Sequence, residues 1–167
     1  MGRPDAGRVV CGGEGALRHC VRMTDSPFKF RHELRVRWAE VDRQGIVFNG
    51  HYLTYFDVGI TEYWRAIGYP YPDGLLAAGT DTFVVKASIE YHAPAHYDDV
   101  LAVLVRVGRL GRTSMQFLLE IRRGDQHLIS GEVIYVMADP KTRKPSPVPD
   151  FLRAAIARYE TVAPSTP

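Results

Sequence analysis

A single helix-patterned segment among strand patterns most limits what this sequence can fold into. Between residues 51 and 67 the apolar residues recur at spacings of three and four, at Tyr52, Phe56, Ile60, Tyr63 and Ile67. This spacing predicts a helix with a wide apolar stripe, which must be buried against another element. Gly68 and Tyr69-Pro70 follow, and they favour a stop because proline cannot continue a helix. The sequence therefore predicts one long helix that needs a large partner surface.

Alternating apolar and polar residues predict strands on both sides of this helix. One strand precedes it over residues 28–41, with Leu34, Val36 and Trp38 alternating. Four follow over 82–91, 100–110, 114–122 and 126–138, and turns at Gly111-Arg112 and Gly124-Asp125 join the last three as antiparallel hairpins. The order lacks strand–helix–strand alternation, which argues against a parallel doubly wound sheet. We predict an α+β fold in which a curled, antiparallel five-stranded sheet wraps around one long central helix.

The rest of the chain divides around this domain. Residues 1–26 are rich in glycine and arginine without sustained periodicity, which predicts a disordered N-terminal arm, and Met23 is an alternative start. Residues 27–160 form the predicted single domain, which includes a short helix over 150–159. A loose Pro/Gly stretch is expected at 69–74, and 161–167 is expected to be a flexible tail.

Composition excludes several classes of function. A formal net charge of +2 is too small for a broad nucleic-acid surface. Cys11 and Cys20 lack a histidine pair or a second CxxC, so no metal site is expected, and reduced thiols favour a cytoplasmic protein. No segment reaches the roughly 20 apolar residues of a membrane span, and the N-terminus lacks the apolar core of a signal peptide.

The segment from Val36 to Leu53 carries the chemistry. A predicted strand ends at Asp42, a tight loop containing Gly45 follows, and the helix begins near Asn49. Free backbone N–H groups at a helix start can hold a developing oxyanion, and a carboxylate nearby can attack or activate water. Taken alone, an aspartate before a turn more often serves as a turn or capping residue.

The same segment resembles the hotdog-fold thioesterases of the 4-hydroxybenzoyl-CoA type. Their hallmark is an aromatic strand followed by Asp-x-x-Gly-(Ile/Val)-Val-aromatic-x-x-x-Tyr-Leu, which stands here as residues 42–53, DRQGIVFNGHYL. Further similar pieces follow in order, at 61–68, 91–99, 111–114 and 139–145. Because the resemblance runs from about residue 30 to 150, it implies a hotdog fold and hydrolysis of an acyl-CoA thioester.

The resemblance also implies roles for the residues of the segment. Asp42 matches the catalytic carboxylate, as nucleophile or as general base, and Gly45 forms the turn. The backbone N–H of Asn49 matches the donor to the carbonyl oxygen. Family members often carry His or Tyr at this position, so a side-chain role is in doubt here while a backbone role survives. His51 is a candidate to compensate, although a lone histidine at a helix start is more often a solvated or capping residue.

Substrate and partner contacts are implied in the same way. Arg112, Thr113 and Ser114 match a turn that helps to hold CoA phosphates, and Tyr52 is a candidate for the acyl site. CoA is part of the substrate, so no separate cofactor is expected. The family forms homodimers or homotetramers, which implies that Asp42 and the phosphate contacts come from different chains. A curled sheet also leaves edges that invite pairing.

Two alternatives to an acyl-CoA thioesterase stay open. Hydrolysis of an acyl-carrier-protein thioester requires a surface that fits an acidic partner, and basic residues near Arg143 are compatible with it. A non-catalytic hotdog protein that binds acyl-CoA would be expected to lack the loop carboxylate, whereas Asp42 is present. A hotdog hydratase would require a different Asp/His pair, which the sequence does not offer.

Overall fold

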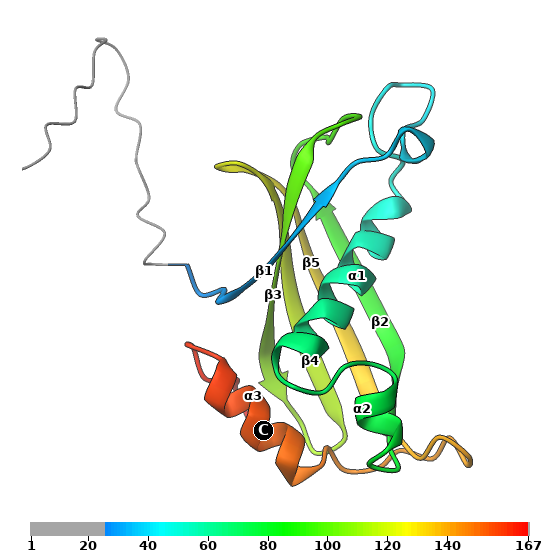
Figure 1. The fold of residues 1–167 in the computed structure, drawn as a ribbon, viewed down its shortest axis with the longest axis vertical. Helices are drawn as coiled ribbons and strands as arrows, with labels where there is room; N and C mark the ends of the chain where they lie inside the picture. The colour runs from blue at the N-terminus through cyan, green and yellow to red at the C-terminus, as the bar shows by residue number, and fades with distance from the viewer. Residues whose placement is uncertain (1–25, 167) are drawn as a thin grey trace, which may run out of the picture.

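The computed structural model describes residues 26–166 and contains one antiparallel sheet with a long helix lying against it (Figure 1). The sheet order is β1-β3-β4-β5-β2, so the first two strands of the chain are its two edges. In chain order the elements are β1 (Phe30–Arg35), η2 (Trp38–Glu40), α1 (His51–Ala66), α2 (Asp73–Leu76), β2 (Asp81–Tyr91), β3 (Val100–Leu110), β4 (Ser114–Arg123), β5 (Gln126–Ala138) and α3 (Asp150–Tyr159). The predicted α+β hotdog architecture is confirmed.

The core lies between α1 and the concave face of the sheet (Figure 1). The predicted stripe of α1, from Tyr52 to Ile67, is buried throughout. Inward-facing residues of the three central strands oppose it, and all are buried: Leu101, Val103, Val105, Val107, Met115, Phe117, Leu119, Ile121, Ile129, Val133, Tyr135 and Met137. The apolar residues that repeat every second position in the strands therefore pack against those that repeat about every 3.6 positions in the helix, in one apolar layer.

Two glycines allow the helix to lie close to the sheet. A Cβ on Gly59 of α1 would stand 2.6 Å from the Val103 side chain of β3. A Cβ on Gly131 of β5 would overlap the ring of Phe56, which is itself buried in the core. The sheet and helix thus approach each other at positions where a side chain is missing.

The first strand is shorter than predicted. β1 ends at Arg35, and Trp38 begins a 3-10 turn in which its side chain is 73% exposed rather than inside the core. The cause is local, because the Glu40 carboxylate accepts the backbone N–H of Arg37 and closes the chain into a turn. The expected loose stretch at 69–74 also differs, since α2 begins within it at Asp73.

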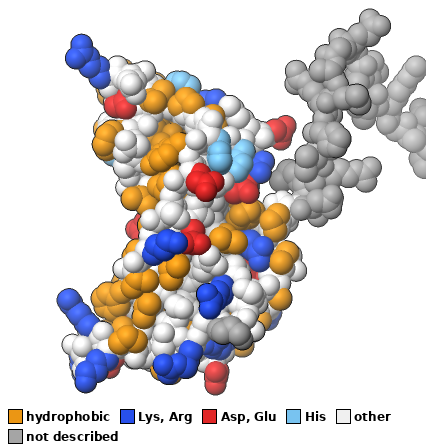
Figure 2. Space-filling view, turned by 180° about the vertical axis from the view of Figure 1, so that it is seen from behind, with side chains coloured by type: hydrophobic (Ala, Val, Ile, Leu, Met, Phe, Trp, Pro, Cys, Tyr) orange, Lys and Arg blue, Asp and Glu red, His pale blue; other side chains and the backbone are white. Residues whose placement is uncertain are grey.

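Strand β2 is an exposed edge. It pairs with β5 along one side, and no other strand of residues 26–166 covers its second side. Val84 and Val85, at a bulge in the ladder, are 54% and 60% exposed. Figure 2 shows the molecule from behind, and hydrophobic side chains lie along the left margin, where β2 runs. The face predicted to be buried on this strand is open at Val85, which is the extra residue of the bulge between Val84 and Lys86.

The C-terminal segment packs against the end of β3. α3 buries Leu152, Ala155 and Ile156, and beyond it the backbone of Ser165 pairs with β3, accepting from Leu110 at 2.9 Å and donating to Gly108 at 2.9 Å. The tail expected to be flexible thus makes regular backbone contacts at Ser165. The predicted arm, with Cys11, Cys20 and Met23, lies outside the described residues.

Candidate active site

The loop that carries Asp42 is a tight hairpin. Asp42 N–H donates to Ile46 O at 2.8 Å, and Gly45 N–H donates to Asp42 O at 2.9 Å. Gly45 has φ of +77°, a conformation that glycine adopts without steric cost, which explains its place in the motif. Asp42 Oδ1 accepts the Gln44 N–H at 2.7 Å. The turn role expected of such an aspartate is therefore real, and it uses one carboxylate oxygen.

The hairpin leads into the start of α1. Phe48 N–H donates to Glu40 O at 2.9 Å, which closes the hairpin at its base. Within residues 26–166 the backbone N–H groups of Asn49 and Gly50 donate to no acceptor, as is usual at a helix start. The Asn49 side chain is exposed. Two free N–H donors thus lie directly after the loop that holds Asp42.

A third segment, after β2, forms hydrogen bonds with both the hairpin and the first turn of α1. Ala95 O accepts the Val47 N–H at 2.9 Å, and Ala95 N–H donates to the Tyr52 hydroxyl at 3.0 Å. Burial raises the pKa of Tyr52 above that of an ordinary tyrosine, which disfavours the phenolate still further. Ala95 therefore holds the hairpin and the first turn of α1 with its two backbone groups.

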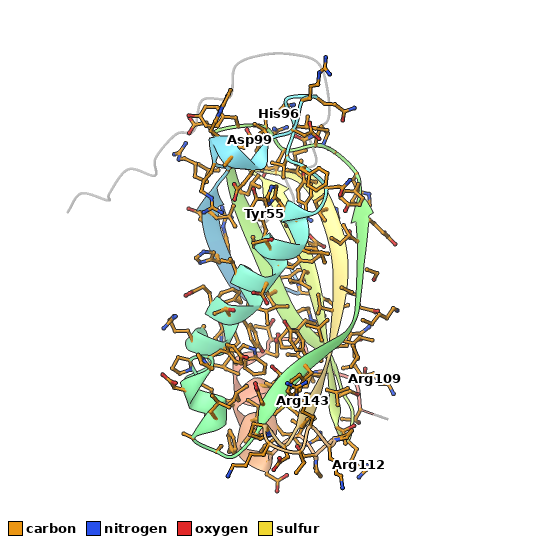
Figure 3. The ribbon with its side chains drawn as sticks, turned by 90° about the vertical axis from the view of Figure 1, so that its right-hand side faces the viewer. Tyr55, His96, Asp99, Arg109, Arg112 and Arg143 are labelled. Atoms are coloured by element: carbon orange, nitrogen blue, oxygen red, sulfur yellow. The ribbon has the colours of Figure 1, made fainter. Side chains whose placement is uncertain are left out.

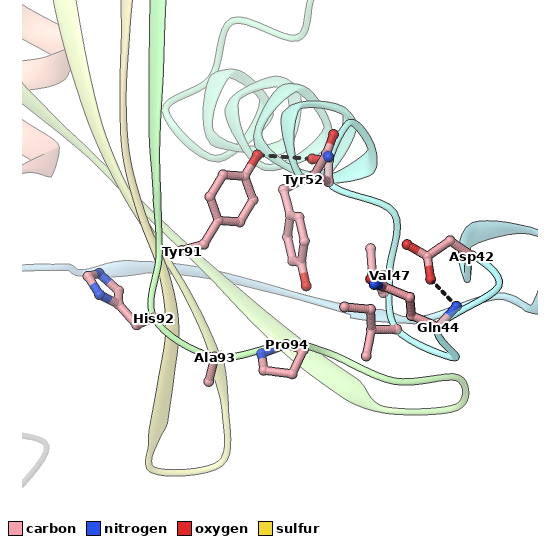
Figure 4. Close-up of a pocket in the computed structure, with 10 residues that line it drawn as sticks. Asp42, Gln44, Val47, Tyr52, Tyr91, His92, Ala93 and Pro94 are labelled. Carbon is pink, nitrogen blue, oxygen red and sulfur yellow. Dashed lines mark hydrogen bonds between the residues drawn. The ribbon is translucent and has the colours of Figure 1, made fainter.

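These three segments enclose a pocket of about 370 Å³ (Figure 4). Its lining residues are Asp42, Gln44, Ile46, Val47, Asn49, Tyr52, Tyr91, His92, Ala93 and Pro94. Three residues predicted from the sequence, Asp42, Asn49 and Tyr52, are brought together there. The other carboxylate oxygen, Asp42 Oδ2, accepts no hydrogen bond from the described residues. Asp42, with an unbonded carboxylate oxygen, and Asn49, with a free backbone N–H, thus line one pocket beside the start of α1.

The remaining predicted residues lie elsewhere. His51 packs its ring edge-to-face on Phe48, with centroids 6.0 Å apart, and does not line the pocket. The turn with Arg112, Thr113 and Ser114 comes after the last residue of β3. The hairpin lies at the other end of this strand, next to Val100 (Figure 3). Eleven residues of β3 separate the two ends, a length of about 35 Å. A single chain therefore does not bring Arg112 to Asp42.

Two residues of the site were not predicted. Glu40 is 3% exposed and lies two positions before Asp42, with its carboxylate bonded to Arg37 and Tyr55. Burial works against its charge, but hydrogen bonds from Arg37 and Tyr55 lower the pKa of Glu40 below its ordinary value. Tyr91, the last residue of β2, lines the pocket and donates to Asn49 O at 3.3 Å. The sequence marks Tyr91 as an alternating apolar position of a strand and as the first residue of the similar piece at 91–99, without a role in the site.

Removing the Tyr91 hydroxyl tests whether that contact matters. Tyr91→Phe keeps the ring that packs on Tyr52 and loses the bond to the Asn49 carbonyl, so the peptide that leads into α1 is held less firmly. We expect kcat for the hydrolysis that the motif implies to fall by about threefold to tenfold, with KM nearly unchanged. Tyr97→Phe is the control, because Tyr97 is exposed and packs on Trp38 outside the pocket. Equal kcat values for the two variants would contradict the expected role.

The described residues offer neither a metal site nor a membrane-spanning helix. No group of three or more His, Cys, Asp or Glu side chains is placed to hold a metal ion in residues 26–166. None of the helices there is long and apolar enough to cross a membrane.

Comparison with known proteins identifies the relatives of this chain. The family model described as the thioesterase superfamily matches residues 44–130, so the match begins two residues after Asp42. The chain is 31% identical over 127 residues to the acyl-CoA thioester hydrolase YbgC of Escherichia coli, covering 75% of this chain and 93% of that protein. It is 30% identical over 134 residues to the acyl-CoA thioesterase YbgC of Haemophilus influenzae, covering 80% of this chain and 96% of that one.

Solved structures share the fold. A hypothetical protein of Aquifex aeolicus matches with a TM-score of 0.71 and 27% identity, over 76% of this chain and 98% of that one. A 1,4-dihydroxy-2-naphthoyl-CoA thioesterase from Synechocystis matches with a TM-score of 0.70 and 24% identity, over 77% and 95% of the two chains, which bears on the fold alone. The chain belongs to the thioesterase superfamily, the hotdog-fold thioester hydrolases that its sequence motif resembles.

Proposed function

We propose that this protein hydrolyses an acyl-CoA to free CoA and a carboxylic acid, with Asp42 as the catalytic carboxylate. The observation that carries the proposal is the shared pocket, which is lined both by Asp42, whose Oδ2 accepts no hydrogen bond, and by Asn49, just before α1. Thioester hydrolysis needs both parts, because a nucleophile attacks the carbonyl carbon while charge develops on the carbonyl oxygen. The names of the two YbgC relatives support CoA as the carrier of the acyl group.

In this mechanism the thioester carbonyl oxygen accepts hydrogen bonds from the N–H groups of Asn49 and Gly50. Either Asp42 attacks the carbonyl carbon, the C–S bond breaks, and water then hydrolyses the resulting anhydride, or Asp42 takes a proton from water that attacks directly. Both routes release CoA as a thiolate that is protonated by solvent. Both also require the carboxylate in the same place, on the Asp42 side of the pocket.

The pocket walls favour an apolar acyl group. Ile46, Val47, Ala93 and Pro94 contribute aliphatic surface, and Tyr52 and Tyr91 contribute two rings at 5.7 Å between centroids. A volume of about 370 Å³ lies at the lower end of ordinary ligand pockets. This supports a short or aromatic acyl group in the portion of the site that one chain supplies. We place the reaction in the cytoplasm, on the evidence of composition.

We further propose that the working enzyme is a homodimer or a tetramer of such dimers, formed by pairing of β2 strands. The exposed edge of β2 has unpaired backbone groups and apolar side chains at Val84 and Val85, which a second copy would cover. Such an assembly can place Arg112, Thr113 and Ser114 of one chain near Asp42 of another. The exposed Arg112 side chain has no hydrogen bond or ion pair in the described part of the chain, which suits a contact with CoA phosphate.

Charging the edge tests this assembly. The double change Val84→Glu and Val85→Glu is expected to give monomers, because like charges would face each other across the paired strands. We expect the monomers to have at least about tenfold lower thioesterase activity, because the binding energy that the partner subunit contributes to catalysis is lost. Sedimentation velocity measures the assembly. Val162→Glu, at an exposed site in the tail, is the control. A fully active monomer would refute a shared site.

The function itself is tested by measuring free thiol released from short, long and aromatic acyl-CoAs. Hydrolysis of at least one class supports the proposal. Hydrolysis only of acyl-carrier-protein thioesters would replace CoA by the carrier protein, a candidate that the sequence leaves open. Binding of acyl-CoA without release of thiol would make the protein a binder rather than an enzyme, and the proposal would fail.

A further inference from the structure

Buried Glu40 bonds to three segments around the hairpin that carries Asp42: the turn at Arg37, the helix at Tyr55 and the chain at Phe48. Its Oε2 accepts the Arg37 N–H at 2.7 Å and the Tyr55 hydroxyl at 2.8 Å, and its Oε1 accepts Arg37 Nε at 2.8 Å. Its backbone oxygen accepts the Phe48 N–H at 2.9 Å. Glu40 does not line the pocket, so it cannot act as a second catalytic carboxylate.

These contacts join the turn at Arg37, the base of the hairpin and the helix α1. The hairpin from Val41 to Val47 lies between Glu40 and Phe48, so the bond from the Phe48 N–H to the Glu40 carbonyl closes its base. Tyr55 lies in the second turn of α1, the helix whose start supplies the N–H donors (Figure 3). The Tyr55–Glu40 bond therefore sets the position of the hairpin relative to that helix.

We propose that Glu40 and Tyr55 are positioning residues of the thioesterase reaction, which hold Asp42 in register with the N–H groups of Asn49 and Gly50. The inference rests on the proposed function and adds to it two residues outside the pocket. Catalysis is sensitive to such placement, since a displacement of about 1 Å can lower a rate by about 100-fold. Arg37 supplies the compensating charge, which allows the carboxylate to be buried beside the site.

The chain contains a matched control on the same helix. Tyr63, also buried, donates to the buried Glu160 Oε1 at 2.7 Å, eight residues after Tyr55. Along a helix, eight residues span about 12 Å, which takes Tyr63 away from the pocket. Tyr55→Phe and Tyr63→Phe each remove one hydroxyl from one buried tyrosine–carboxylate bond. Each is expected to lower the midpoint of thermal unfolding by a few degrees, about 2–6 °C.

Only one of the two substitutions should slow the reaction. We expect Tyr55→Phe to lower kcat by about tenfold and leave KM within about twofold, while Tyr63→Phe leaves both unchanged. Glu40→Gln, which keeps the shape of the side chain but loses its charge, is expected to lower kcat further, by about 100-fold. Equal kcat values for the two tyrosine variants would overturn the proposal, as would a rise in KM alone.

A second readout does not depend on turnover. Hydrogen exchange of the Asp42 and Phe48 amides reports the hairpin and its base directly, because both N–H groups are bonded within it. We expect Tyr55→Phe to speed their exchange by at least about tenfold relative to Tyr63→Phe. Equal exchange in the two variants would overturn the anchoring. An inactive wild-type protein would instead refute the proposed function, and the exchange comparison would still decide whether Tyr55 anchors the hairpin.

Discussion

Asp42→Asn is expected to lower kcat for acyl-CoA hydrolysis by about three orders of magnitude or more, because an amide can neither attack the thioester nor accept a proton from water. The loop should survive the change. An asparagine oxygen can still accept the Gln44 N–H that Asp42 Oδ1 accepts now. The expected signature is therefore a folded protein with nearly normal KM and almost no turnover, measured by release of free thiol.

Asp125→Asn is the control for the loss of one negative charge. Asp125 lies in the exposed turn between β4 and β5 and makes no hydrogen bond or ion pair within residues 26–166. Its substitution should leave kcat and KM unchanged. If Asp42→Asn kept more than about a tenth of the wild-type kcat, the catalytic carboxylate would have to be another residue.

Gly131→Ala is expected to destabilise the fold by about 3 kcal/mol, at the upper end of what overpacking a core usually costs. The added methyl group would overlap the ring of Phe56 and stand 3.1 Å from the Ser88 carbonyl oxygen of β2. Phe56 is buried between α1 and the sheet, so its ring has no free space to enter. Urea unfolding followed by circular dichroism measures the change in free energy.

Gly108→Ala makes the same chemical change on the other face of the sheet. Its Cβ would meet the end of the Leu118 side chain at 2.7 Å, but Leu118 is partly exposed and can turn toward solvent. We expect a cost of about 1 kcal/mol or less at this position. If both substitutions lowered the free energy of unfolding by similar amounts, the close packing of α1 on β5 that the structure indicates would be wrong.

The fold could be predicted because its two periodicities are long and consistent. The stripe from Tyr52 to Ile67 and the alternation in β3, β4 and β5 are both buried as expected. The errors occur where one local contact overrides the pattern. Trp38 continues the alternation of β1 in sequence, yet the Glu40 carboxylate draws the chain into a turn and leaves Trp38 exposed. The position of β2 as an edge depends on strand order, which alternation does not encode.

The lining of the candidate pocket could be predicted where the motif is contiguous in sequence. Asp42, Asn49 and Tyr52 lie within eleven residues, and all three line one pocket. Tyr91 is 42 residues beyond Asn49, and only the folded sheet brings its hydroxyl to the Asn49 carbonyl. Glu40 was overlooked because an acidic residue next to a loop usually points into solvent, whereas Tyr55 and Arg37 allow this one to be buried.

The strand order has a consequence for how the enzyme loses activity under stress. β3, β4 and β5 are consecutive hairpins with short turns, whereas β1 and β2 join the sheet only at its margins. The hairpin with Asp42 continues from β1, which pairs with β3 alone and stays at a margin of the sheet even when a second copy pairs with β2. Marginal strands open locally at a lower free energy than central ones. Catalytic activity should therefore be lost while β3, β4 and β5 are still folded. Activity then reports partial unfolding earlier than the circular dichroism of the sheet does.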